Sequence, residues 1–291
     1  MIVIDFLAQN REAFLFFVAL LGLIVGSFLN VVIHRLPIMM ERQWHRDCDE
    51  LKGLDSESSS ETEVYNLNTP GSSCPKCQHR IRPWENIPII SWLVLKGRCS
   101  NCKNPISIRY PTVEAVSGAL SLWVAFHFGF TWETVAALFL TWSLIALTMI
   151  DFDLQLLPDN ITLPFLWLGL FVNIGGLFTT LESAVIGAIA GYLSLWSVYQ
   201  LFKKLTGKEG MGYGDFKLLA MLGAWLGWQY LPQIILLSAL VGAVVGILLI
   251  VVRGRDRNIP IPFGPYLAAA GWISLMWGAQ INEAYLRWSG L

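Results

Sequence analysis

Long apolar stretches recur along the chain, and they constrain its fold more than any other feature. A helix of about 20 apolar residues crosses a bilayer core about 30 Å thick. Hydrophobic residues make up 55% of the 291 residues and charged residues 14%, whereas a soluble domain carries about 25% charged residues. The sequence therefore predicts an all-α polytopic membrane protein. Its apolar stretches predict about eight transmembrane helices, over residues 13–34, 112–130, 133–150, 160–178, 182–202, 212–229, 231–252 and 264–286.

The distribution of Lys and Arg predicts how these helices are oriented. Cytoplasmic loops of membrane proteins are enriched in both residues. If the segment after the first helix is cytoplasmic, all 20 Lys and Arg except Arg11 and Arg287 face that side. We therefore expect a multi-pass protein of the bacterial inner (cytoplasmic) membrane, with both termini on the opposite side. A net charge of −1 gives no basic footprint for nucleic acid, so the expected partner is membrane lipid.

One sizeable polar segment follows the first apolar stretch. It suggests three parts: a first transmembrane helix over 1–35, a cytoplasmic insert over 36–110 and a seven-helix membrane domain over 111–291. The first half of the insert, Met40 to Ser73, is rich in acidic residues and Ser. This composition predicts a flexible, solvated stretch.

The second half of the insert contains two C-x-x-C motifs. Cys74 and Cys77 form one, and Cys99 and Cys102 form the other after 21 intervening residues. Two such motifs can supply four thiolates to one tetrahedral zinc ion, and a closed four-Cys site is structural rather than catalytic. Two disulfides are the alternative, but the expected compartment is reducing. Cys48 is then an ordinary free thiol.

Acidic residues lie at the ends of two apolar stretches, on the predicted cytoplasmic side. Asp151 and Asp153 end the third stretch, and Asp215 follows Gly212 and Gly214 at the start of the sixth. Ionisable residues at membrane depth are costly and are candidates for function. Two carboxylates held together can hydrolyse a peptide bond: one activates water while the other, protonated, polarises the carbonyl. The two glycines would allow a substrate backbone to approach closely.

Other interpretations of these acids stay open. Asp159 is expected to cap the fourth helix, and Asp153 could be a solvated interfacial acid. Asp215 could be no more than an acidic residue at a helix N-terminus, where the helix dipole stabilises negative charge. Alternatively, Asp151, Asp153 and Asp215 could hold Mg²⁺ in a transferase of lipid-linked groups. A transporter with a zinc-stabilised domain is a third possibility, but it would place acids near the bilayer midplane.

Further polar residues punctuate the first apolar stretch and the insert. Gly26 and Ser27 are small enough for close helix contact. Asn30 and His34 lie on one helical face and could bond a neighbouring span, a role that suits His34 better than catalysis. Glu85 and Asn86 could contact a methylation substrate or could simply form a turn.

Four segments in order resemble the bacterial type IV prepilin peptidases, also called leader peptidases, over about residues 12–286. They are Gly26-Ser-Phe-Leu-Asn-Val-Val-Ile-His-Arg-Leu-Pro37, the cysteine-framed stretch from Asn86 to Cys99 continuing to Glu114, Ile150-Asp-Phe-Asp-Leu-Gln-Leu-Leu-Pro-Asp159, and Gly210-Met-Gly-Tyr-Gly-Asp-Phe-Lys217. The resemblance implies a membrane aspartic protease of the G-x-G-D class. It implies that Asp151 and Asp215 are catalytic and that 111–291 is the peptidase domain.

The resemblance also implies the substrates. Members of this family cut type IV prepilins and the pseudopilins of type II secretion after the Gly that ends a short basic leader. Members with the cysteine-bearing insert often methylate the new N-terminal amine with S-adenosylmethionine. All four motif cysteines are present here, so we expect both activities. The sequence does not indicate a binding site for S-adenosylmethionine.

Overall fold

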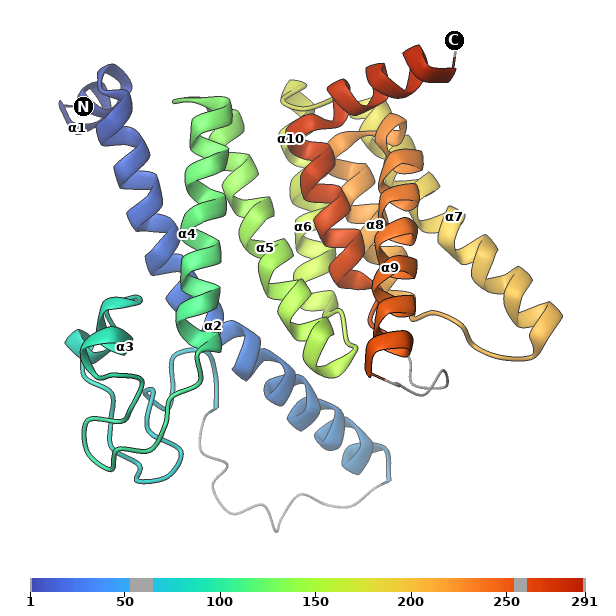
Figure 1. The fold of residues 1–291 in the computed structure, drawn as a ribbon. Coiled ribbons are helices and arrows are strands. Elements are labelled where there is room, and N and C mark those ends of the chain that lie inside the picture. The colour runs from blue at the N-terminus through green and yellow to red at the C-terminus, as the bar shows by residue number, and fades with distance from the viewer. Residues whose placement is uncertain (1, 53–64, 254–260, 290–291) are drawn as a thin grey trace. The chain divides into compact units, whose positions relative to one another are not determined.

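The computed structural model describes residues 2–52, 65–253 and 261–289, which are helical apart from loops and two isolated β-bridges (Figure 1). The predicted all-α class is confirmed for these residues. The chain forms two compact units, Met1–Ala125 and Phe126–Leu291. Part of the predicted flexible stretch (53–64) and the basic residues Arg255 and Arg257 lie outside the described ranges.

Each of the eight predicted apolar stretches contains helix. The helices are α2 (Arg11–Leu51), α4 (Arg109–Phe128), α5 (Trp132–Leu154), α6 (Asp159–Val172), α7 (Leu181–Thr206), α8 (Tyr213–Leu226), α9 (Leu231–Arg253) and α10 (Gly264–Ser289). Among the described residues, 4 helical segments are long and apolar enough to cross a membrane: Arg11–Leu51, Trp132–Leu154, Leu181–Thr206 and Trp228–Val252. The eight-span arrangement therefore stays a prediction.

The first long helix does not end where the polar segment begins. After the short α1 (Ile2–Gln9), α2 runs for 41 residues with Pro37 buried inside it. A proline removes one backbone hydrogen bond, and here the helix resumes its bonding beyond it. Residues 41–51 are exposed, so the prediction of a flexible stretch is wrong for 40–51, which is solvated but helical. At 1.5 Å per residue, α2 is about 60 Å long, roughly twice the thickness of a bilayer core.

In the first unit, α2 and α4 approach closely through small residues. A Cβ added at Gly22 would lie 2.5 Å from Ser121 Oγ, and one at Gly26 would lie 2.8 Å from the Cα of Glu114. The Ser117 hydroxyl donates a 2.6 Å hydrogen bond to the Gly22 carbonyl. Small residues four apart let helices pack in lipid through backbone contact, which confirms the expected role of Gly26.

The polar residues that follow on α2 have different surroundings. The Asn30 amide donates to the Tyr110 carbonyl at the start of α4, at 3.1 Å. The expected bond to a neighbouring helix is therefore confirmed for Asn30. His34, one turn further along, is exposed.

In the second unit, the short helix α8 is enclosed by α6, α7 and α10. From Asp215 to Leu226 its residues are buried, except for half-buried Lys217. Its C-terminal carbonyls, at Ala224 and Trp225, accept two 2.9 Å hydrogen bonds from the Asn173 amide. A helix of 14 residues is about 21 Å long. The side chains of α8 are therefore buried by the neighbouring helices rather than by lipid.

Glycines bring the backbones of α7 and α8 together. A Cβ at Gly187 would overlap the carbonyl oxygen of Gly223, and a Cβ at Gly223 would overlap that of Gly187. One turn along, a Cβ at Gly191 would lie 2.7 Å from the Leu219 carbonyl. The G-x-x-x-G spacing on α7 therefore fixes α8 in depth and rotation.

Replacing Gly223 with Ala should destabilise the protein even though Ala favours helix. The higher helix propensity of Ala stabilises a helix by about 1 kcal/mol relative to Gly. Overpacking typically destabilises a protein by about 1–3 kcal/mol, and here the atoms that the new Cβ would meet belong to rigid backbone. We expect a lower thermal midpoint for Gly223→Ala in detergent. Gly175→Ala, whose added Cβ meets nothing within 4 Å, is the matched control and should change little. Equal midpoints for the two variants would contradict this packing.

Candidate active site and metal centre

Asp151 lies in the last turn of α5. The helix ends at Gln155, which adopts a left-handed conformation and donates its amide to the Asp151 carbonyl at 2.9 Å. The Asp151 side chain is only 5% exposed. Its Oδ2 accepts a 3.0 Å hydrogen bond from the backbone amide of Gly264, the first residue of α10. The end of one helix and the start of another thus hold this carboxyl group.

Asp215 lies in the first turn of α8 and is 7% exposed. Its backbone amide donates to the carbonyl of Gly212, the N-cap residue, at 3.3 Å. Leu157 packs against both Gly214, next to Asp215, and Gly264, next to Asp151; that the two carboxyl groups act as one pair stays a prediction.

The two motif glycines differ in their surroundings. A Cβ at Gly212 would have Asp215 Oδ2 as its nearest neighbour, at 3.9 Å, so the space beside that carboxyl is open. A Cβ at Gly214 would lie 2.7 Å from the Cβ of Leu157. Close approach to a substrate thus remains a prediction for Gly212. It also stays a prediction for Gly214, where the packing of Leu157 is a further reason for a residue without a side chain.

Two residues that the sequence did not single out complete this site. Leu157 packs against Gly214 on one side and against Gly264 on the other. A Cβ at Gly264 would lie 2.6 Å from Asp151 Oδ2, so only glycine lets the α10 amide reach that carboxyl. The Pro262-Phe263-Gly264-Pro265 run is a turn signal, but a turn signal does not reveal which side chain its amide will bind.

The remaining acids lie outside the buried pair. Asp153 is exposed. Asp159 is the first residue of α6 rather than its cap, and both of its carboxylate oxygens accept 2.7 Å bonds from Lys217. This ion pair joins the first residue of α6 to the second turn of α8. The expected cap is wrong because the carboxylate reaches a lysine on another helix.

The four motif cysteines gather in the first unit. The Sγ atoms of Cys74, Cys77, Cys99 and Cys102 all lie within 4.8 Å of one another. The Sγ atoms of Cys74 and Cys102 are 3.7 Å apart, and those of Cys77 and Cys99 are 4.0 Å apart. A tetrahedral ion with metal–sulfur bonds of about 2.3 Å requires about 3.8 Å between sulfurs. The spacing fits one metal ion, and all four are free thiols rather than disulfides.

The two halves of the cluster share one backbone pattern. The amide of Cys74 donates to the His79 carbonyl, and the amide of Cys99 donates to the Asn104 carbonyl, at 2.9 and 2.8 Å. An isolated β-bridge flanks each half, and Gln78 and Lys103 both have positive φ. Each C-x-x-C motif therefore forms the same tight turn, which presents two sulfurs to one point.

Amide groups directed at Cys77 and Cys99 favour their thiolate forms. At Cys102 the Asn104 amide acts in the same direction, but burial and the other three thiols outweigh it and raise the pKa to about 11. The His79 amide lowers the pKa of the Cys77 thiol to about 6 against the opposing effect of burial. The amides of Cys102 and Asn101 lower the pKa of Cys99. The Asn101 side chain also donates to Cys77 Sγ at 3.6 Å. Such bonds orient and tune metal ligands, so the cluster is suited to a cation.

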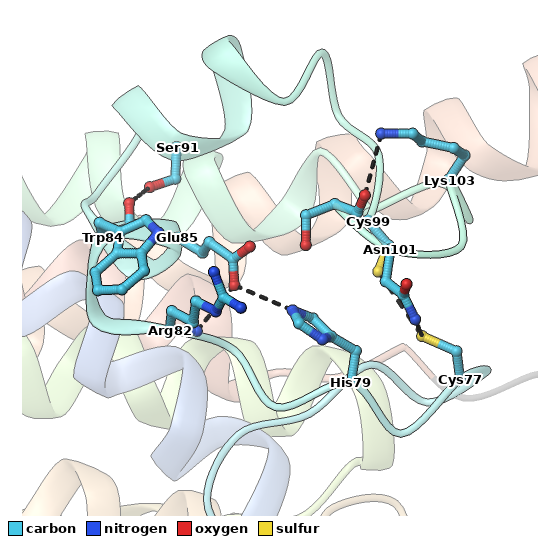
Figure 2. A network of polar contacts seen from close by, with 10 residues as sticks. Cys77, His79, Arg82, Trp84, Glu85, Ser91, Cys99, Asn101 and Lys103 are labelled. Carbon is cyan, nitrogen blue, oxygen red and sulfur yellow. Dashed lines mark hydrogen bonds and ion pairs between the residues drawn. The ribbon is translucent and has the colours of Figure 1, made fainter.

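A polar network supports the same turns (Figure 2). Glu85 accepts a 2.9 Å bond from the Arg82 amide and lies 3.4 Å from His79 Nε2. The Arg82 amide is the main cause of a lowered pKa for Glu85. Because these contacts turn its carboxylate inward, Glu85 holds the fold of the insert. Asn86 ends the short helix η2 (Pro83–Asn86) and is exposed.

The described residues thus combine two buried carboxyl groups at helix ends with helices long enough to cross a membrane. Comparison with known families is more specific. The Bacterial Peptidase A24 N-terminal domain matches residues 20–128, and the Type IV leader peptidase family matches 138–247. Together with the relatives below, these matches show that the chain belongs to the type IV leader peptidase family.

Curated relatives align over almost the whole chain. Proteins from Pseudomonas aeruginosa and Stutzerimonas stutzeri are each 59% identical, with coverage of 99% of this chain and of 98% and 99% of their own lengths. A protein from Aeromonas salmonicida is 58% identical over 92% of each chain. All three are named prepilin leader peptidase/N-methyltransferase. No solved structure matches the chain.

Removing one ligand should abolish metal binding by the cluster. We expect the purified protein to bind about one Co²⁺ with the absorption of a tetrahedral thiolate site, and Cys74→Ser to lose that absorption. Cys48→Ser is the control, because Cys48 is exposed and lies outside the cluster. An unchanged cobalt spectrum for Cys74→Ser would contradict a four-cysteine site.

Proposed function

We propose that the chain removes the leader from type IV prepilins and N-methylates the new N-terminal residue. Membership of the leader peptidase family and the shared name of its relatives support both activities. The buried pair Asp151 and Asp215 carries the peptidase half of the proposal. The pseudopilins of type II secretion are proposed as further substrates, because their leaders share the same chemistry.

In the proposed mechanism, the carboxyl pair shares one proton. The ionised member takes a proton from water, which attacks the carbonyl carbon of the Gly that ends the leader. The protonated member polarises the carbonyl oxygen and later protonates the leaving amine. The open space beside Gly212 gives a substrate backbone room near Asp215. Because both aspartates lie at helix ends, on the side that the distribution of Lys and Arg predicts to be cytoplasmic, we propose that cleavage takes place at the cytoplasmic membrane face.

Methylation follows on the amine that cleavage releases. S-adenosylmethionine supplies a methyl group whose bond to sulfur breaks as the nitrogen–carbon bond forms, and the amine loses one proton. We assign this step to the insert over 36–110, and cleavage to the membrane domain over 111–291. Zinc is the proposed occupant of Cys74, Cys77, Cys99 and Cys102, with a structural role, because four thiolates leave no open coordination position.

A Mg²⁺-dependent transferase of lipid-linked groups agrees less well with the site. Such an enzyme needs a free basic side chain near its acids to bind phosphate. Lys217, the nearest in sequence, is paired with both oxygens of Asp159. Asp153, the third acid of that arrangement, is exposed while the other two are buried. A transporter is disfavoured because Asp151 and Asp215 lie in terminal helical turns.

Replacing either buried aspartate should abolish cleavage of a co-expressed prepilin. General acid–base groups contribute about 10²–10⁴-fold to a rate, so Asp151→Asn and Asp215→Asn should each lose at least that factor. Asp153→Asn is the matched control and should cleave normally. The measurement is the ratio of processed to unprocessed pilin on a gel. Full cleavage by either buried variant would contradict the dyad and revive the transferase.

Methylation should be separable from cleavage by withholding the methyl donor. With purified protein and prepilin, cleavage should proceed without S-adenosylmethionine and yield an unmodified N-terminus. Adding the donor should increase the mass of the mature pilin by one CH₂ group, on the terminal amine, by mass spectrometry. Cleaved pilin that stays unmodified in the presence of donor would remove the methyltransferase half of the proposal and leave the peptidase half intact.

A further inference from the structure

The insert presents an apolar face that its own fold leaves uncovered. The face lies on η2, α3 (Ile90–Val94) and the turn between them. Its side chains are Trp84 (62% exposed), Ile87 (45%), Ile90 (58%), Leu93 (60%) and Val94 (73%). Positions 90, 93 and 94 fall on one side of a helix. Large exposed apolar patches mark interaction sites.

The opposite side of α3 is fixed to the insert, so the apolar face must point outward. The buried Ser91 hydroxyl donates to the Trp84 carbonyl at 2.9 Å, and the Trp92 indole donates to the Ile106 carbonyl at 3.2 Å. Gly97, with a φ of +66°, lies against the Trp92 ring, where an added Cβ would be 2.9 Å away. These contacts hold the short helix in one orientation.

A hydrogen bond to α4 sets the depth of this face. The Ile89 amide, just before α3, donates to Glu114 Oε2 at 2.7 Å. Glu114 in turn packs against Gly26 of α2. The α2 helix has no charged residue between Glu12 and Arg35. Gly26 lies within this uncharged part, nine helical residues or roughly 13 Å before Arg35. The start of α3 therefore lies at the same depth as the apolar part of α2. Figure 1 agrees, because it shows α3 beside the lower turns of α4.

The charges around the face have one sign. Arg82, Lys96 and Arg98 are exposed on the same segment, while the carboxylate of Glu85 is turned toward His79. Basic residues beside apolar and aromatic side chains are the composition of segments that lie in the interface of an anionic membrane. A second protein would not explain why the face lies at this depth.

We propose that the η2–α3 face is a membrane-binding surface that inserts into the cytoplasmic leaflet of an anionic bilayer. The basic residues contact the lipid headgroups, and the cysteine cluster is held against the membrane surface. The proposal goes beyond cleavage and methylation and requires only that α2 crosses the membrane.

Spin labels can locate the face directly. A nitroxide attached to a genetically encoded keto amino acid, which leaves the cysteines untouched, is placed at Ile90 or Val94. Controls are placed at the exposed positions Ser72 and Asp49. The full chain is reconstituted in vesicles of phosphatidylethanolamine and phosphatidylglycerol. Collisions with oxygen, which partitions into lipid, are compared with collisions with a water-soluble nickel chelate. Retained cobalt binding by each labelled variant verifies the folded insert.

The labels at Ile90 and Val94 should collide more with oxygen than with the nickel chelate, and the labels at Ser72 and Asp49 should show the reverse. Dominant nickel collisions at both test positions would overturn the proposal by placing the face in water. Low collision rates of these labels with both oxygen and the nickel chelate would also overturn the proposal, because they would show that protein buries the face. A face that is aqueous alone but shielded when prepilin is added would assign it to the substrate instead.

Discussion

Two carboxyl groups removed from water inside a helical unit are the constraint that organises the second unit. Removing a charged carboxylate from water costs several kcal/mol unless partners compensate for it. Asp151 has the Gly264 amide as a partner, and Asp215 begins a helix whose dipole favours negative charge. Both partners are backbone groups at helix starts. The positions of α8 and α10 relative to α5 are therefore part of the proposed chemistry.

The glycine contacts show how that positioning is achieved. Gly187 and Gly223 bring the backbones of α7 and α8 into direct contact, and Gly214 and Gly264 both make room for Leu157. Backbone contacts deform less than contacts between long side chains. Contacts of this kind fix the helices that carry the two acids, as the proposed acid–base catalysis requires.

Much of this arrangement could be predicted from local sequence. The apolar stretches predict the helices, the C-x-x-C spacing predicts the sulfur cluster, and the acids at helix ends predict a carboxyl pair. The features that the sequence did not predict have a common cause. The length of α2 past Pro37, the packing of Leu157 on Gly214 and the bond from Gly264 to Asp151 depend on segments that are distant in sequence. Local propensity does not include such contacts.

The central claim is that Asp151 and Asp215 act as one catalytic unit. Groups that act together lose little more when both are removed than when one is. The most direct test is the single-turnover cleavage rate of prepilin by Asp151→Asn, Asp215→Asn and the double variant, at high enzyme concentration. We predict that the double variant is no slower than the slower single variant. Losses that multiply in the double variant would show two independent roles and contradict the shared site.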